Sequence, residues 1–246
     1  YERDIDPLME RTVNRPIPSG YISPNHALAF GLTICLLGIG IVTLLANPNA
    51  GILTAFSAFF YVCIYTMLLK RRTPQNIVIG GLAGATPPAI GWAAASGDID
   101  SALPWLMVLT IFMWTPPHFW ALALFMRGDY DNAGVPMLTV THGRKATRAH
   151  ILVYTLLLAA LAVAIAFTGA GGPVYLVVAV VLNALFIKGA LRIWRRTEED
   201  AEADNFAAER GFFKLSLLYL FAHFGAILVE AGLDRAGVAL SLGGLL

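Results

Sequence analysis

Seven long apolar runs constrain the fold of this 246-residue chain more than any other feature. Each run is close to the ~20 residues that a helix needs to cross the core of a bilayer. None alternates polar and apolar residues as a membrane β-strand does. The expected spans are 26–46, 50–69, 75–95, 103–125, 150–169, 172–193 and 213–232. Charged residues make up 13% of the chain, about half the usual share. We therefore predict an all-α, polytopic transmembrane helix bundle embedded in a lipid bilayer.

Lys and Arg are concentrated in every second connecting segment. Segments 1–25, 70–75, 126–149 and 192–212 carry 3, 3, 4 and 4 of them, whereas the alternate segments carry only Arg235. Basic loops stay on the cytoplasmic side of a membrane, and long loops usually build the functional surface. We expect a multi-pass protein of the cell inner membrane, or of the mitochondrial inner membrane in a eukaryote, with its active site on the cytoplasmic or matrix side. A net charge of +1 argues against a general nucleic-acid binder.

The first segment of the chain carries two acidic residues with the spacing of one helical turn, Glu2 and Asp6. If this segment is helical, both carboxylates lie on one face. They then repel each other unless a cation lies between them. Mg²⁺ binds in this way, with one or two carboxylates and the oxygens of a phosphate. An ordinary solvated helix end with mixed charges is the alternative.

A second acidic cluster, Asp129-Tyr130-Asp131, lies in loop 126–149 on the same side of the predicted bundle. Together with the first segment it predicts a site for Mg²⁺ ions around one diphosphate. Taken alone, the cluster is also typical of a polar turn before Gly134 and Pro136.

Three consecutive cations, Lys70, Arg71 and Arg72, end the second expected span. Such a run commonly anchors a helix at the membrane surface. It is also suited to neutralising a diphosphate leaving group, with Asn76 adding a neutral hydrogen bond. Both interpretations are open on the residues alone.

The fourth expected span contains Trp114-Thr115-Pro116-Pro117-His118-Phe119-Trp120. Prolines within a span are tolerated where protein or a cavity satisfies the freed backbone groups. An ionisable His118 at this depth indicates a functional site, or a kinked helix whose histidine bonds to a neighbouring carbonyl. The glycines of the third span, from Gly80 to Gly84, favour close helix packing.

Five stretches in this order resemble the UbiA-type intramembrane prenyltransferase superfamily, and most closely its haem-farnesylating branch. The stretches are Glu2–Asp6 with Met9, Arg11, Thr12 and Asn14–Pro16; Tyr65–Thr66 with Lys70–Arg71, Thr73 and Asn76–Gly81; Trp114–Trp120; Asp129–Tyr130 with Ala133–Gly134 and Pro136–Leu138; and Arg210, Phe213, Ser216 and Tyr219. The resemblance covers nearly the whole chain as a single domain, 1–246.

This resemblance implies Mg²⁺-dependent transfer of the farnesyl group of farnesyl diphosphate to a vinyl group of protohaem IX, giving haem O. It implies metal ligands at Glu2, Asp6, Asp129 and Asp131, and catalytic roles for Asp6, Asp129, Lys70 and His118. The implied substrate-binding residues are Asn14, Arg15, Tyr65, Lys70, Arg71, Asn76, Trp114, Trp120 and Tyr130. Hand-over of the product to a downstream haem A synthase or to oxidase assembly proteins is a further expectation.

Two departures from the superfamily pattern concern its acidic motifs. Glu2 replaces the first aspartate of Asn-x-x-x-Asp-x-x-x-Asp, whose Asn would precede Tyr1. Ala133 stands four residues after Asp129, where the second motif often has another aspartate, so Asp129 is the firmer ligand. The family has nine spans and seven are visible, so we expect the first span and most of the second to precede this chain.

Three other functions compete with this one. A prenyltransferase acting on an aromatic quinone precursor uses the same diphosphate machinery and differs only in its acceptor residues; the Trp114–Trp120 segment favours haem. A secondary transporter also has kinked helices, but its charged site lies near mid-membrane. A non-catalytic assembly factor leaves the paired acidic motifs without a purpose.

Overall fold

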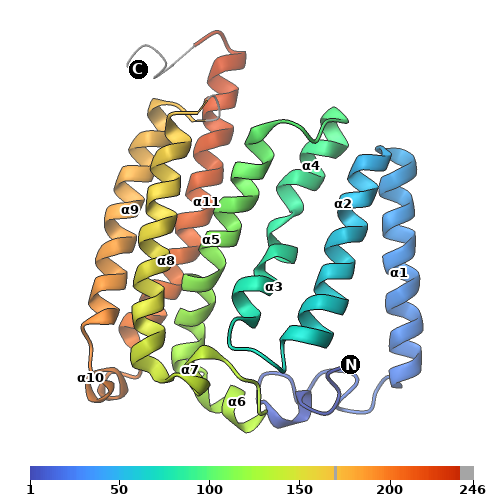
Figure 1. The fold of residues 1–246 in the computed structure, drawn as a ribbon, viewed down its shortest axis with the longest axis vertical. Coiled ribbons are helices and arrows are strands. Elements are labelled where there is room, and N and C mark those ends of the chain that lie inside the picture. Colours follow the sequence, from blue (N-terminus) through green and yellow to red (C-terminus); the bar gives the residue numbers. More distant parts are fainter. Residues whose placement is uncertain (169–170, 239–246) are drawn as a thin grey trace. The chain divides into compact units, whose positions relative to one another are not determined.

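The computed structural model describes residues 1–168 and 171–238. These residues form helices and connecting turns, without a strand (Figure 1). Seven helical segments are long and apolar enough to cross a membrane, which confirms the predicted number of spans. They cover Pro24–Leu45, Pro48–Leu69, Asn76–Ser96, Ala102–Phe125, Gly143–Ala166, Pro173–Trp194 and Ala207–Arg235. Residue 169, the last of the fifth predicted span, lies outside the described residues.

Two helices begin well before the spans predicted for them. The fifth crossing, α8 (Gly143–Ala166), starts in a segment that the sequence placed in a loop, and α11 (Ala207–Arg235) starts before residue 213. Both N-terminal extensions carry charged residues. A hydropathy pattern therefore places these segments in loops, although their backbone is helical. Arg144 and Arg148 on α8 pair with Glu198, and the buried Glu209 on α11 lies 3.5 Å from Arg148. These ion pairs stabilise helical turns beyond the apolar part of the span.

The chain forms two compact units. The first unit comprises 1–108 and 126–141. In it, α1 (Pro24–Leu45) packs on α2 (Pro48–Phe59), and α2 packs on α3 (Asn76–Ala85) and α4 (Pro87–Ser96). The short helices η1 (Asp6–Leu8), α6 (Arg127–Asn132) and α7 (Leu138–Thr141) belong to the same unit.

The second crossing changes its winding part of the way along. It begins as α2 and continues as η2 (Phe60–Leu69), a π-helix. The amide of Lys70 donates to the carbonyl of Tyr65 at 2.9 Å, a bond that reaches back five residues. Stretches of π-helix are rare and often occur at functional sites. Here the π-helix ends where the three consecutive cations begin.

The packing of η2 on α3 depends on a missing side chain. A Cβ atom on Gly80 would overlap the ring of Tyr65 and lie 2.8 Å from its Cε2 atom. Gly84, one turn further along, has no such neighbour within 4 Å. The prediction that glycines of this span serve helix packing is therefore confirmed at Gly80 and wrong at Gly84.

The second unit comprises 109–125 and the described residues from 142 onward. Its helices are α5 (Ala102–Phe125, of which residues 109–125 belong here), α8, α9 (Pro173–Trp194), α10 (Glu198–Ala203) and α11. Both α8 and α11 pack on α9. A buried hydrogen bond joins Tyr219 Oη to Asn183 Oδ1 at 2.7 Å, and Asn183 donates onward to the carbonyl of Ala159 at 3.1 Å.

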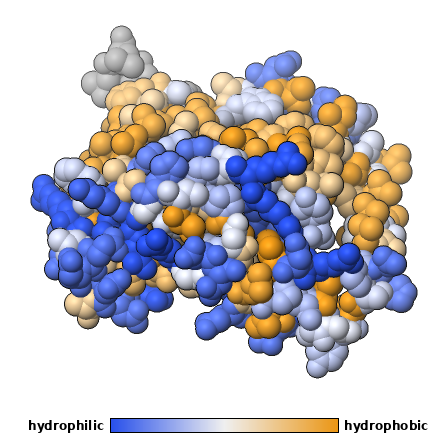
Figure 2. Space-filling view, turned by 60° about the horizontal axis from the view of Figure 1, so that its bottom comes forward, coloured by the Kyte–Doolittle hydropathy of each residue, from blue (hydrophilic) through white to orange (hydrophobic). Residues whose placement is uncertain are grey.

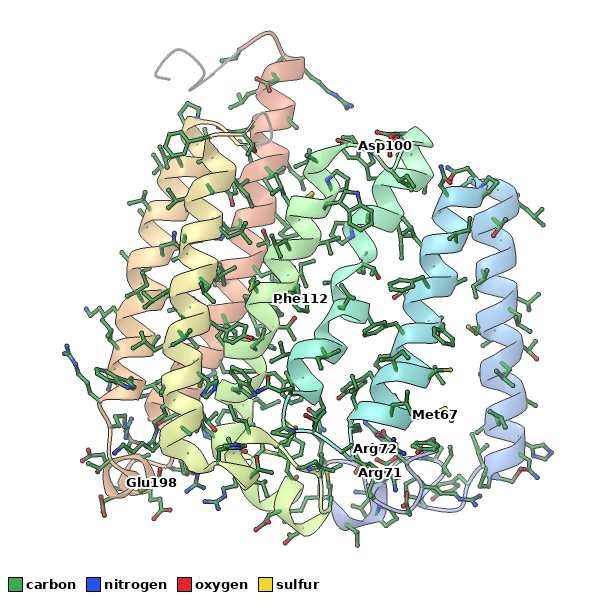
Figure 3. All side chains as sticks on the ribbon, viewed as in Figure 1. Met67, Arg71, Arg72, Asp100, Phe112 and Glu198 are labelled. Carbon is green, nitrogen blue, oxygen red and sulfur yellow. The ribbon has the colours of Figure 1, made fainter. Side chains whose placement is uncertain are left out.

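In each unit taken separately, hydrophilic side chains gather at the helix ends that are brought forward in Figure 2, and hydrophobic side chains cover the helix sides. This is the distribution expected of helices whose sides contact lipid. In the second unit the hydrophilic end includes α10, beside which Glu198 is labelled in Figure 3.

Candidate functional site

Ion pairs join the first segment of the chain to the end of η2. Lys70 pairs with Glu2, and the side chains of both are about four-fifths shielded from solvent. Arg71 donates two hydrogen bonds of 2.6 Å to Asp4, and Tyr1 Oη donates to the carbonyl of Met67 at 3.1 Å. Figure 3 labels Met67, Arg71 and Arg72 at this end of the helix. Two segments singled out separately in the sequence therefore lie together.

The Arg71 guanidinium stabilises the charged form of the Asp4 carboxyl group. Its hydrogen bonds lower the pKa of the Asp4 carboxyl to about 2, and the carboxylate in turn raises the pKa of Arg71. Both groups stay charged over the physiological range.

Glu2 and Asp6 are one turn apart, as predicted. The amide of Asp6 donates to the carbonyl of Glu2 at 2.9 Å. The carboxylate of Asp6 is largely buried and accepts from Arg15 at 3.3 Å, while Thr12 Oγ1 donates to the Asp6 carbonyl at 2.6 Å. Each of the two acidic side chains thus has a basic partner of its own.

The second acidic cluster lies on α6 in the same unit. Burial raises the pKa of the Tyr130 phenol, and neighbouring Asp129 raises it further, whereas Arg11 of the first segment lowers it. Tyr65 on η2 interacts electrostatically with Glu2 and with Tyr130. All three polar segments of this unit are therefore within electrostatic reach of one another.

Individual residues of the α6 cluster differ in environment. Asp129 is half-buried, and its Oδ2 atom is buried without a hydrogen-bond partner among the described residues. Asp131 is exposed, as is Asn14 of the first segment. The orphaned oxygen of Asp129 is the feature expected of a carboxylate that binds a cation.

Asn76 closes the turn after the three cations. It is fully buried, and its Nδ2 donates to the carbonyl of Lys70 at 3.2 Å. Its Oδ1 is buried and has no partner in the part of the chain that the structure describes. Asn76 therefore holds the backbone that carries Lys70 and keeps one acceptor free.

A groove of about 340 Å³ opens beside the first segment. Its charged lining comes from the first segment, and most of its apolar lining comes from α1 and η2. The residues are Tyr1, Glu2, Arg3, Asp6, Ile17, Pro24, Ala27, Leu28, Tyr61, Val62 and Thr66. A ligand with a charged head and an apolar tail matches this division.

The predicted magnesium ligands do not form a preassembled cluster. No group of three or more acidic, histidine or cysteine side chains close enough to share one ion is found among residues 1–168 and 171–238. The carboxylates of Glu2 and Asp6 contact cations instead. Because Mg²⁺ is commonly held by one or two carboxylates together with substrate phosphates, this donor set fits an ion that arrives with a diphosphate.

A separate polar cluster lies inside the second unit, around His118 of α5. The imidazole stacks between Trp114, with ring centroids 4.1 Å apart, and Phe213 of α11 at 4.6 Å. Its Nδ1 lies 2.6 Å from Ser216 Oγ, and Trp114 Nε1 donates to the carbonyl of Ser216 at 2.7 Å. The sequence singled out His118 and Trp114, and the structure brings them into direct contact.

Trp120, also a predicted substrate contact, is fully buried. Its ring meets His150 and Tyr154 of α8 edge-on, with centroids 5.7 and 5.4 Å away. In this structure Trp120 packs α5 against α8.

Comparison with known proteins identifies the family of this chain. The model of the UbiA prenyltransferase family matches residues 1–218. The chain belongs to the UbiA prenyltransferase family. A protoheme IX farnesyltransferase of Ruegeria pomeroyi is 66% identical over 97% of this chain and 74% of its own length. Proteins with the same description from a Ruegeria species and from Cereibacter sphaeroides are 63% and 59% identical, each over 97% of this chain and 76% of the relative. No solved structure matches.

Membership of the UbiA family makes this chain a prenyltransferase, as the resemblance implied, and rules out the transporter and the assembly factor. Sequence reasoning missed Asp4 as the partner of Arg71, because it considered only the acidic residues one helical turn apart. It also left Ser216 and Phe213 without a role, although both belong to the C-terminal stretch that matched the family.

Proposed function

We propose that this UbiA-family prenyltransferase transfers the farnesyl group of farnesyl diphosphate to a vinyl group of protohaem IX and so makes haem O. The observation that carries the proposal is the identity of 66% over 97% of the chain with a protein described as a protoheme IX farnesyltransferase. The groove beside the first segment and the His118 cluster suit the two substrates, since each substrate combines an apolar body with a charged end.

The proposed reaction balances without an oxidant or a reductant. The bond between C1 of farnesyl and the diphosphate oxygen breaks, and its electron pair leaves with diphosphate. The terminal vinyl carbon of protohaem supplies the electron pair for the new bond to C1. The positive charge left on the carbon next to the porphyrin ring is quenched by water, which loses a proton and becomes the hydroxyl group of haem O.

The ion pairs of the first unit suggest how diphosphate is bound. Lys70 pairs with Glu2, and Arg15 pairs with Asp6. An incoming diphosphate offers these cations a stronger partner. The released carboxylates, together with Asp129, are then free to hold Mg²⁺, which when bound stabilises negative charge on the leaving diphosphate. Arg71 and the amide of Asn76 adjoin the same site.

Aromatic rings suit the allylic cation that forms when the carbon–oxygen bond weakens. Tyr65, which is in electrostatic reach of Glu2, presents a ring packed against Gly80. The negative face of such a ring stabilises a cation by up to about 2 kcal/mol when water is excluded. Tyr130, with its raised phenol pKa, remains a neutral neighbour.

The distribution of basic residues indicates the side of the membrane on which the reaction takes place. We assign the site to the cytoplasmic side of the inner membrane, because the first segment, loop 70–75 and loop 126–149 carry the basic residues. The product keeps a long apolar tail, so it passes through the membrane or directly to a membrane-bound acceptor such as a haem A synthase or an oxidase assembly protein.

The test is to incubate membranes containing the protein with protohaem, farnesyl diphosphate and Mg²⁺, and to analyse extracted haems by mass spectrometry. Haem O is expected, and in H₂¹⁸O its hydroxyl group carries the label. Chelation of Mg²⁺ before the incubation should abolish the product. Absence of farnesylated haem, or transfer to a quinone precursor offered in its place, contradicts the proposal.

A further inference from the structure

The hydrogen bonds around Ser216 determine which nitrogen of His118 carries a proton. Ser216 Oγ has a single hydrogen, and it donates this hydrogen to the carbonyl of Phe213 at 2.6 Å. The contact of 2.6 Å between Ser216 Oγ and His118 Nδ1 therefore requires Nδ1 to be the donor. In the neutral ring, Nε2 is then left with its lone pair.

The imidazole is fixed in orientation as well as in tautomer. Trp114 and Phe213 stack on its two faces at interplanar angles of 17° and 23°. Trp114 is itself anchored to the carbonyl of Ser216. The His118 side chain is half-buried, and no hydrogen bond to Nε2 is found in the described part of the chain. Metal-binding histidines commonly show this arrangement, in which the second nitrogen donates to a protein acceptor.

A line of rings leads from His118 to a cation at the end of α5. Phe213 meets Phe125 edge-on at 6.2 Å, and the Arg210 guanidinium lies 4.3 Å over the ring of Phe125. Arg210 is exposed, and no ion pair to it is found among residues 1–168 and 171–238. His118 and Phe125 are separated by about 10 Å along the helix axis, at about 1.5 Å per residue. That separation is comparable to the distance from the centre of a porphyrin to its propionate groups.

We propose that α5 and α11 form the docking site for an iron porphyrin, with His118 Nε2 as an axial ligand of the iron and Arg210 as the partner of the propionates. Ser216 is the positioning residue that keeps Nε2 available. In this orientation the propionates stay near the polar helix end and the vinyl edge points into the apolar part of the span. The proposal rests on the proposed function only in taking protohaem as the acceptor.

The two other histidines within the membrane-crossing helices of this unit, His150 on α8 and His223 on α11, are less suited to the role. His223 is 1% exposed, so an iron porphyrin has no access to it. His150 bonds to the carbonyl of Ala146 of its own helix at 2.9 Å and meets Trp120 edge-on. His118 alone of these three has stacked rings on both faces and a cation at the end of the same line of rings.

The test is a titration of the purified protein in lipid nanodiscs with ferric protohaem, followed by absorption and electron paramagnetic resonance. The wild type should show the signature of imidazole-bound iron. His118→Ala should lose it, and free imidazole should restore it in His118→Gly. His150→Ala is the matched control and should keep it. Loss of the signature in His150→Ala, or its persistence in His118→Ala, overturns the assignment of the ligand.

Ser216 and Arg210 are tested by readouts that general misfolding does not reproduce. Ser216→Ala should raise the Kd for haem about tenfold and lower the iron–histidine stretching frequency of ferrous haem, because Nδ1 loses its acceptor. An unchanged frequency contradicts the role of Ser216.

Arg210→Gln should raise the Kd for protohaem about tenfold but leave the Kd for its dimethyl ester unchanged. Lys188→Gln, on the exposed face of α9, is the control for overall charge.

Haem O formation by the wild type, measured in parallel, separates this inference from the proposed function. An imidazole-bound porphyrin without haem O contradicts the proposed function and leaves the docking site standing. Haem O formation without an imidazole signature overturns the docking site and leaves the proposed function standing.

Discussion

Lys70, at the end of η2, forms an ion pair with Glu2 in the first segment of the chain. The two side chains are 19% and 20% exposed, so water screens the pair only in part. One partner belongs to a segment predicted to bind metal, and the other to a run of cations that is equally typical of membrane anchoring. Their contact favours a joint role in binding diphosphate.

Lys70→Ala should lower kcat/KM for farnesyl diphosphate by a factor of about 100 or more, since one group that stabilises the leaving diphosphate is lost. Arg72→Ala is the matched control: Arg72 is exposed, and no ion pair to it is found in the described residues. It should change kcat/KM by less than about threefold, as expected of a screened surface charge. The kcat/KM of each variant is obtained from rates of haem O formation. Equal decreases in kcat/KM in the two variants contradict a specific role for Lys70.

Asp129→Asn should abolish turnover, because its buried carboxylate oxygen has no hydrogen-bond partner among residues 1–168 and 171–238 and is the oxygen expected to bind Mg²⁺. Asp131→Asn changes the same charge at an exposed position and should keep most of the activity. The measurement is the dependence of rate on Mg²⁺ concentration. If Asp131→Asn lowered the activity more than Asp129→Asn, the metal site would lie on the exposed side of α6 instead.

Gly80→Ala should destabilise the first unit by about 1–3 kcal/mol, because the new methyl group overlaps the ring of Tyr65. Gly84→Ala, with open space around its Cβ position, should leave stability unchanged or raise it slightly. Thermal unfolding in detergent compares the two variants. Similar unfolding temperatures for both would mean that η2 and α3 adjust their distance at little cost.

Arg148→Met should destabilise the second unit by about 3–5 kcal/mol, because the fully buried carboxylate of Glu209 then keeps, within the described part of the chain, only the ion pair with Arg196 at 3.6 Å. Replacing both partners, as in Arg148→Met with Glu209→Leu, should recover much of the loss. Glu202→Gln alters an exposed partner of Arg144 and should stay within about 0.5 kcal/mol. Chemical unfolding in detergent tests the series, and a double variant no better than Arg148→Met contradicts the pairing.

The Asp4–Arg71 bridge should hold the first segment in place at neutral pH and release it in acid. Because Arg71 lowers the pKa of Asp4 from 3.8 to about 2, the bridge contributes fully above about pH 4 and is lost as the pH falls toward 2. Hydrogen exchange of residues 1–8, corrected for intrinsic rates, should be slower in the wild type than in Asp4→Asn at pH 5. The difference should vanish near pH 2, and a constant difference contradicts the bridge.

Hydropathy alone was sufficient to predict the seven crossings, because a helix in lipid must cover its backbone with apolar side chains. Their ends were harder to predict: α8 starts at Gly143 because Arg144 and Arg148 find carboxylate partners, and pairing of this kind leaves no trace in hydropathy. The alternation of basic loops predicted only that the three polar segments of the first unit share one side of the membrane. Their individual roles in metal and substrate binding stay predictions.

Features that depend on hydrogen-bond register were beyond sequence reasoning. Nothing in the composition of 60–69 distinguishes a π-helix from an α-helix, since both bury the same residues in lipid. The pairing of His118 with Ser216 joins positions on helices far apart in the chain, and only the packing of α11 on α5 places a hydroxyl group beside that imidazole.

The wide winding of η2 also determines the direction in which Lys70 leaves the membrane. In an α-helix each residue turns the chain by about 100° about the helix axis, and in a π-helix each residue turns it by less. The Lys70 side chain therefore leaves η2 in a different direction from the one that ten residues of α-helix would give. Losing or gaining one residue in the crossing before Lys70 would swing the ammonium group away from Glu2, and an insertion or deletion before Tyr61 would also rotate the groove-lining side chains of η2. We therefore expect this crossing to tolerate insertions and deletions poorly, even far from its charged end. Its apolar composition alone gives no sign of this constraint.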